Sequence, residues 1–72
     1  AEAGGNMPCV MNAANEEAVG LFLSGRILLS EIPELVMRVC EETARIEKPS
    51  LSDIIEENMR ARALTANYAA SR

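Results

Sequence analysis

The 72-residue chain contains no histidine, no tryptophan and only one Phe and one Tyr. The absence of histidine excludes histidine-ligated zinc sites and histidine-based acid–base catalysis. The scarcity of aromatic residues argues against a stacking platform for single-stranded nucleic acid. Basic residues are few as well: seven against eleven acidic residues give a net charge of −4, so we expect no nucleic acid partner.

Cysteines and long apolar runs are equally scarce. Cys9 and Cys40 match no spacing of a metal or redox motif. No apolar run approaches the roughly 18 residues of a membrane span, and no signal peptide is visible. We therefore expect a reduced cytoplasmic location and no membrane partner. The chain starts at Ala1 rather than at Met, which favours a trimmed or excised piece.

What the chain does contain is the composition of a folded domain, with 49% hydrophobic and 25% charged residues. A domain this small buries a low fraction of its surface and has no disulfide or metal to stabilise it. We therefore expect it to depend on a partner surface, either a second copy or a larger parent protein.

Good helix formers dominate between the glycines and prolines, and no segment alternates like a strand. The sequence predicts an all-α fold, a small bundle of three long helices in antiparallel order. The first helix is expected from about Pro8 to Ser24. The second follows Ser30 and ends near Lys48, and the third begins at Ser50.

Particular residues support these boundaries. Pro8 suits a first helical turn, and Gly25 suits the left-handed position just past a helix end. Pro49 disfavours helical geometry in the residue before it. Ser50 and Asp53 have the spacing of a capping box.

Each predicted helix has an apolar stripe that predicts its buried face. In the first helix the stripe contains Met7, Val10, Met11, Ala14, Ala18, Leu21 and Phe22. In the second it contains Ile32, Leu35, Val36, Val39, Cys40, Thr43 and Ile46, and its centre is expected in the core. In the third it contains Leu51, Ile54, Ile55 and Met59, and after Met59 it thins to Ala, Thr, Leu64 and Tyr68.

No residue of the chain is predicted to be catalytic, to bind a cofactor or to ligate a metal. The acidic pairs at 16–17, 41–42 and 56–57 are adjacent in helices, so the two side chains of a pair diverge and cannot chelate together. The segment Gly4–Gly5–Asn6 could cradle an anion, but no basic residue precedes Arg26, which favours a simple lead-in to the helix.

Two groups of residues are candidates for contacts with other molecules. Asn is unfavourable inside a helix, so Asn12 and Asn15, with Glu16 nearby, mark either a solvent-exposed face or a polar interface with another domain. The wide first stripe predicts self-association into a homodimer or larger oligomer, with Met11, Leu21 and Phe22 near the contact.

Several stretches resemble the C-terminal domain of the 1-deoxy-D-xylulose 5-phosphate reductoisomerase family. The residues that carry the resemblance are Gly4–Glu16, containing Asn-Ala-Ala-Asn-Glu, then Ala18–Val19, Phe22–Leu23, Gly25–Ile27, Ile32–Pro33, Pro49–Ile55 and Ala61–Arg62. The Asn-Ala-Ala-Asn-Glu core with its flanks is the most specific part, and the resemblance extends over nearly the whole chain.

The resemblance implies that residues 1–72 are one C-terminal helical-bundle domain of a larger enzyme. Such enzymes isomerise and reduce 1-deoxy-D-xylulose 5-phosphate to 2-C-methyl-D-erythritol 4-phosphate in non-mevalonate isoprenoid biosynthesis. They use NADPH with Mg²⁺ or Mn²⁺, held by domains that this chain lacks. The implied partner is the catalytic domain of the parent. The family bundle has one more helix before Gly4, so we expect this chain to start after it.

Two other functions fit the residues alone. The chain could be a free-standing acidic helical module for protein–protein interaction that pairs with itself, or it could bind an apolar ligand between its helices. The start at Ala1 and the uncovered apolar stripe favour a structural domain of a larger protein, without catalysis of its own.

Overall fold

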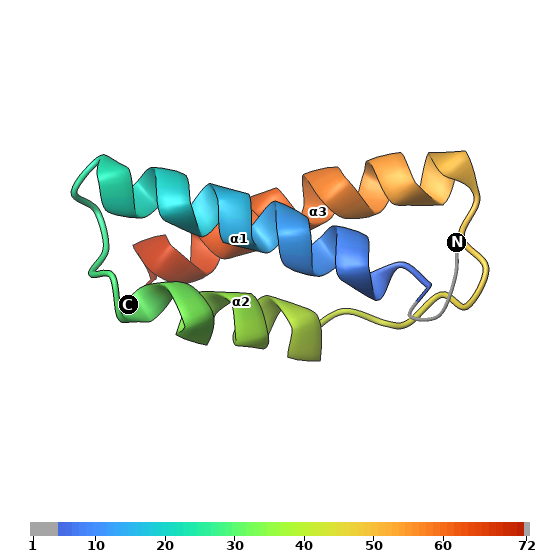
Figure 1. The fold of residues 1–72 in the computed structure, drawn as a ribbon, viewed down its shortest axis with the longest axis horizontal. Coiled ribbons are helices and arrows are strands. Elements are labelled where there is room, and N and C mark those ends of the chain that lie inside the picture. The colour runs from blue at the N-terminus through green and yellow to red at the C-terminus, as the bar shows by residue number, and fades with distance from the viewer. Residues whose placement is uncertain (1–4, 72) are drawn as a thin grey trace.

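The computed structural model describes residues 5–71, and over these residues it contains three helices and no strand. They are α1 (Met7–Leu23), α2 (Glu31–Glu41) and α3 (Leu51–Ala70). Figure 1 shows α1 crossing the centre of the molecule, with α2 along its lower side and α3 passing behind it. The chain reverses direction at each connection, which confirms the predicted all-α antiparallel bundle.

The predicted ends of α1 are confirmed to within a residue. Pro8 lies in its first turn. At the other end Gly25 has a φ of 81°, and its N–H donates to the carbonyl of Phe22 at 3.0 Å. The N–H of Arg26 donates to the carbonyl of Leu21 at 2.9 Å, which completes a Schellman motif. Glycine is required here because other residues rarely adopt this conformation.

Helix α2 is shorter than predicted, because it ends at Glu41 and not near Lys48. The backbone groups that would continue it are bonded to Asn6 instead. The N–H of Ile46 donates to Asn6 Oδ1 at 2.8 Å, and Asn6 Nδ2 donates to the carbonyl of Ala44 at 3.0 Å. The apolar pattern beyond Cys40 therefore belongs to the α2–α3 connection, where Ile46 is half-buried.

Two small clusters that share Tyr68 form the core. The first is built from Val10, Ala13, Ala14, Val39 and Ala61. The second is built from Ala18, Ile27 and Leu35. Tyr68 packs against both, and the Arg38 guanidinium carbon lies 4.0 Å from the centre of its ring. Alanine side chains at the centre of α1 allow the neighbouring helices to approach closely, since little side-chain volume separates the backbones.

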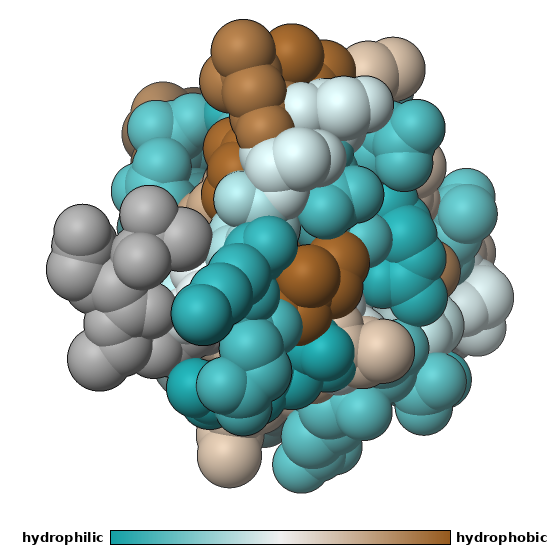
Figure 2. Space-filling view, turned by 90° about the vertical axis from the view of Figure 1, so that its right-hand side faces the viewer, coloured by the Kyte–Doolittle hydropathy of each residue, from teal (hydrophilic) through white to brown (hydrophobic). Residues whose placement is uncertain are grey.

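The predicted apolar face of α3 is wrong in its first half. Leu51, Ile55 and Met59 are 77%, 53% and 66% exposed, and of the predicted stripe in this half only Ile54 is half-buried. Helix α3 instead buries Ala61 and Thr65, with the Thr65 hydroxyl donating to the carbonyl of Ala61 at 2.8 Å. Small residues suit this contact because the alanines of α1 let the two helices approach closely, while Leu64 and Tyr68 pack against the same cluster. Figure 2 views the end of the molecule where α1 and α3 begin, and it shows hydrophobic surface at the top, over the first turns of α3.

Candidate domain interface

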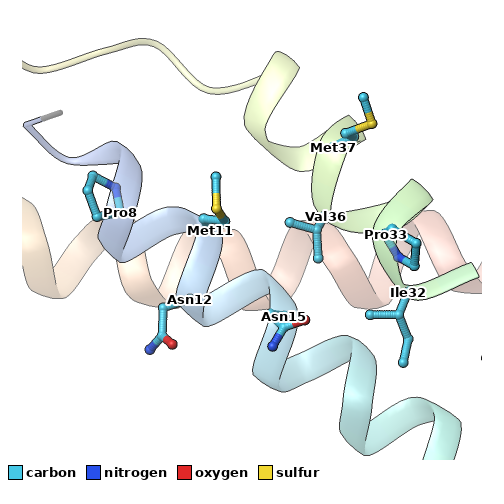
Figure 3. Close-up of a pocket in the computed structure, with 8 residues that line it drawn as sticks. All are labelled: Pro8, Met11, Asn12, Asn15, Ile32, Pro33, Val36 and Met37. Carbon is cyan, nitrogen blue, oxygen red and sulfur yellow. The ribbon is translucent and has the colours of Figure 1, made fainter.

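An open groove runs between α1 and α2. Its volume is about 810 Å³, and it is lined by Pro8, Met11, Asn12 and Asn15 of α1 and by Ile32, Pro33, Val36 and Met37 of α2. Figure 3 shows these side chains along the two helices that form it. None of them is charged, although the whole chain carries a net charge of −4. Met11 and Met37, on opposite walls, are both more than half exposed.

The structure separates the three residues predicted for a domain interface. Asn12 and Asn15 are exposed and both line the groove. Glu16 is exposed too, but its Oε1 accepts a hydrogen bond from Arg62 Nη2 of α3. The groove therefore has two amides, each able to donate and to accept, while the carboxylate of Glu16 is directed to another helix.

The three residues predicted for self-association also lie in different places. Met11 lines the groove, whereas Leu21 and Phe22 are half-buried against the cluster of Ala18, Ile27 and Leu35. A single chain does not test whether they contact a second copy, so that contact stays a prediction.

Groups that could ligate a metal are not brought together in the described part of the chain. Among residues 5–71, no three Asp, Glu, Cys or His side chains are placed to hold a metal ion. The thiol of Cys9 donates to the carbonyl of Ile54 at 3.7 Å. Burial, together with the neighbouring charge of Glu41, raises the pKa of the Cys40 thiol and favours its protonated form.

Sequence reasoning missed the structural importance of Gly5 and Asn6. Asn6 is fully buried, its N–H donates to the carbonyl of Ile46 at 3.1 Å, and its side chain also donates to Glu57 Oε1 at 3.2 Å. Gly5 has a φ of 55°, and a Cβ added there would lie 2.0 Å from the carbonyl oxygen of Ile46. This segment is thus an anchor for the α2–α3 connection. The Asn6 N–H that an anion cradle would use is already bonded.

Residues 5–71 form no helix with both the length and the apolar character needed to cross a membrane.

Comparison with known proteins gives a consistent match. The family model described as the DXP reductoisomerase C-terminal domain matches residues 1–64. A 1-deoxy-D-xylulose 5-phosphate reductoisomerase from Synechococcus sp. (strain JA-2-3B'a(2-13)) is 52% identical over 66 residues, which cover 92% of this chain and 17% of the relative. The protein of that name from Nitrosomonas europaea is 44% identical over 68 residues, covering 94% of this chain and 16% of the relative. The protein of that name from Thermosynechococcus vestitus is 45% identical over 69 residues, which cover 93% of this chain and 17% of the relative. The chain thus spans only 16–17% of the length of these curated relatives.

Proposed function

This chain belongs to the DXP reductoisomerase C-terminal domain family, and from that membership we propose that residues 1–72 are a single structural domain of a larger reductoisomerase, without catalysis of their own. The observation that carries the proposal is the family match over residues 1–64. The domain would brace the catalytic part of its parent as a small helical bundle.

The activity we propose for the parent is that named for the relatives. The parent enzyme would isomerise and reduce 1-deoxy-D-xylulose 5-phosphate to 2-C-methyl-D-erythritol 4-phosphate in the cytoplasm. It would use NADPH and Mg²⁺ or Mn²⁺. The described residues do not fit the metal, because their carboxylates are not gathered into a cluster. They offer no glycine-rich loop after a strand for NADPH. We therefore assign both groups to other domains of the parent and derive no step of the reaction from this chain.

For the contact with the catalytic domain we propose the α1–α2 groove. Its apolar walls offer surface to bury, and the amides of Asn12 and Asn15 offer hydrogen bonds that fix the orientation of a partner. The unbranched, polarisable side chains of Met11 and Met37 adapt to an opposing surface. Glu16, one turn after Asn12, would lie at the rim of this interface with its carboxylate held by Arg62.

A chimera tests the proposal. In the Synechococcus relative, the 66-residue region that matches this chain is replaced by residues 1–72. We expect the chimera to oxidise NADPH in the presence of 1-deoxy-D-xylulose 5-phosphate, and a deletion of the same region to be inactive. An inactive but folded chimera beside an active parent would contradict the proposed role.

The groove is tested in the same chimera by Met37→Glu. A carboxylate placed in a buried apolar contact without a partner costs about 3–5 kcal/mol, so domain docking and activity should be lost. Leu28→Glu is the matched control, because Met37 and Leu28 are 63% and 68% exposed in the single chain and Leu28 does not line the groove. Equal activity of the two variants would exclude the groove as the docking face.

A further inference from the structure

Helix α3 has an apolar row that is largely exposed. Leu51, Ile55 and Met59 are spaced four residues apart, so they follow one another along a single face of the helix. All three are more than half exposed, and none lines the α1–α2 groove. Hydrophobic surface over the first turns of α3 is visible in Figure 2. This row is therefore an uncovered surface separate from the groove.

The charges of α3 are divided between its two halves. Asp53, Glu56 and Glu57 are its acidic residues and all precede Met59, whereas the basic residues Arg60 and Arg62 follow it. A helix with this division repels a parallel copy of itself. It attracts an antiparallel copy, in which the acidic end of each helix lies nearest the basic end of the other. Asp53 and Glu57 are directed away from the row, to Ser50 and to Asn6, so Glu56 is the acidic side chain of α3 that lies beside it.

We propose that the apolar row of α3 pairs antiparallel with the same row of a second copy of this chain. A two-fold axis matches a surface to itself, so Ile55 of each copy packs against Met59 of the other. Leu51 extends the contact toward the outer ends. Two copies repel each other overall, because each carries a net charge of −4. At this face, in contrast, an acidic side chain of one copy lies near a basic side chain of the other.

The charged residues beside the row fit the same register. Glu56 follows Ile55 and Arg60 follows Met59, so both lie along one edge of the row. A two-fold axis perpendicular to the helices brings this edge against the same edge of the other copy. The register that pairs Ile55 with Met59 and the one that pairs Glu56 with Arg60 differ by about 3 Å along the axis, which an arginine side chain spans.

The guanidinium of Arg60 is already held in position by its own chain. Its Nη1 donates to Thr43 Oγ1 at 3.0 Å and its Nη2 donates to the carbonyl of Glu42 at 3.2 Å. These bonds hold the guanidinium in place and leave further N–H groups for a carboxylate. Arg62, in contrast, already pairs with Glu16 of its own chain. The reciprocal Glu56–Arg60 pairs thus set the orientation, and the apolar row supplies the buried area.

The contact is small, so we expect a weak dimer with a dissociation constant on the order of 10⁻⁴ M. Sedimentation equilibrium of the 72-residue chain measures it, and the result does not depend on the proposed function. Met59→Glu should raise the dissociation constant at least about tenfold. Met11→Glu makes the same exchange at a methionine of α1 that is 52% exposed, and it should leave the dissociation constant unchanged.

Charge reversal tests the orientation. Glu56→Arg alone and Arg60→Glu alone each place like charges together twice in a dimer, so each should weaken self-association about three- to tenfold. Mixing the two variants should restore pairing as a heterodimer, because both contacts then become attractive. Thermal melts of each variant verify that it is folded before mixing.

Three outcomes would overturn the proposal. The first is a chain that remains monomeric up to about 1 mM, which would leave the row to a different partner. The second is a dimer that is lost with Met11→Glu and kept with Met59→Glu, which would show that the dimer contact lies on α1 and not on α3. The third is a dimer of the expected strength whose charge variants do not pair preferentially on mixing, which would exclude the antiparallel register.

Discussion

Gly5 and Asn6 join the start of α1 to a part of the chain 40 residues further on. The side chain of Asn6 is fully buried and makes hydrogen bonds with Ala44, Ile46 and Glu57. The sequence shows only a Gly-Gly-Asn segment before a helix, which is equally typical of a simple lead-in. The difference lies in the α2–α3 connection that surrounds Asn6, and no local pattern reveals such a distant partner.

Gly5→Ala should lower the free energy of unfolding by about 2 kcal/mol or more. The cost of placing alanine in a left-handed conformation adds to the cost of the collision between its Cβ and the Ile46 carbonyl. Gly20→Ala should raise the free energy of unfolding by about 0.5–1 kcal/mol, since Gly20 is inside α1 and an added Cβ would meet no atom within 4 Å. Urea denaturation of the two variants measures both effects. Equal effects in the same direction would mean that Gly5 is not held against the α2–α3 connection.

At the level of elements, the sequence predicted helix starts better than helix faces. Proline, glycine and the Ser50–Asp53 pair act locally, so the limits of α1 and the start of α3 were predictable. The end of α2 was not, because residues 44–46 bond to Asn6 rather than to a further helical turn. The buried face of α3 was predicted only in its second half, where Leu64 and Tyr68 pack against the core. In the first half hydrophobicity favours the largest side chains, Leu51, Ile55 and Met59, but these are exposed.

The capping box of α3 provides a test at this scale. Ser50 Oγ accepts from the N–H of Asp53 at 3.0 Å, and Asp53 Oδ2 accepts from the N–H of Ser50 at 3.0 Å. Ser50→Ala should therefore cost about 1 kcal/mol of stability. Ser52→Ala, at an exposed position within the first turn, should change stability by less than about 0.5 kcal/mol. Thermal melts followed by circular dichroism distinguish the two, and identical melts would show that the cap contributes nothing.

The whole molecule depends on a small core. Its largest fully buried side chains are Val10, Val39, Asn6 and Thr65, so few residues contribute much buried apolar area. Of the three central residues of the second predicted stripe, Leu35 and Val39 are buried as expected, whereas Val36 is half-buried. For the candidate interface, the sequence indicated Asn12 and Asn15 as unusual residues. It could not indicate the groove around them, because the groove exists only where α1 and α2 pack side by side.

Leu35→Ala should leave the isolated chain largely unfolded at room temperature. The substitution costs about 2–5 kcal/mol in a packed core, and a domain of this size has about 5 kcal/mol in total. Leu29→Ala is the control, because Leu29 is 64% exposed and its truncation should change stability by less than about 0.5 kcal/mol. Far-ultraviolet circular dichroism during heating measures both. A cooperative melt of Leu35→Ala at the wild-type temperature would show that this leucine is not part of the core.

The hydrogen bonds of Asn6 have a consequence for how the chain opens. Residues 42–50 lie outside the helices, and a surface connection of this kind usually opens by itself, exposing its amides to exchange and its backbone to proteases. Here the side chain of Asn6 bonds to groups 38 and 40 residues away within the connection and to Glu57 of α3, 51 residues away, so the connection opens only when its bonds to the start of α1 break. The amide of Ile46 should then exchange with solvent deuterium as slowly as the amides inside the helices. A segment without regular structure thus shares the cooperative unfolding of the bundle.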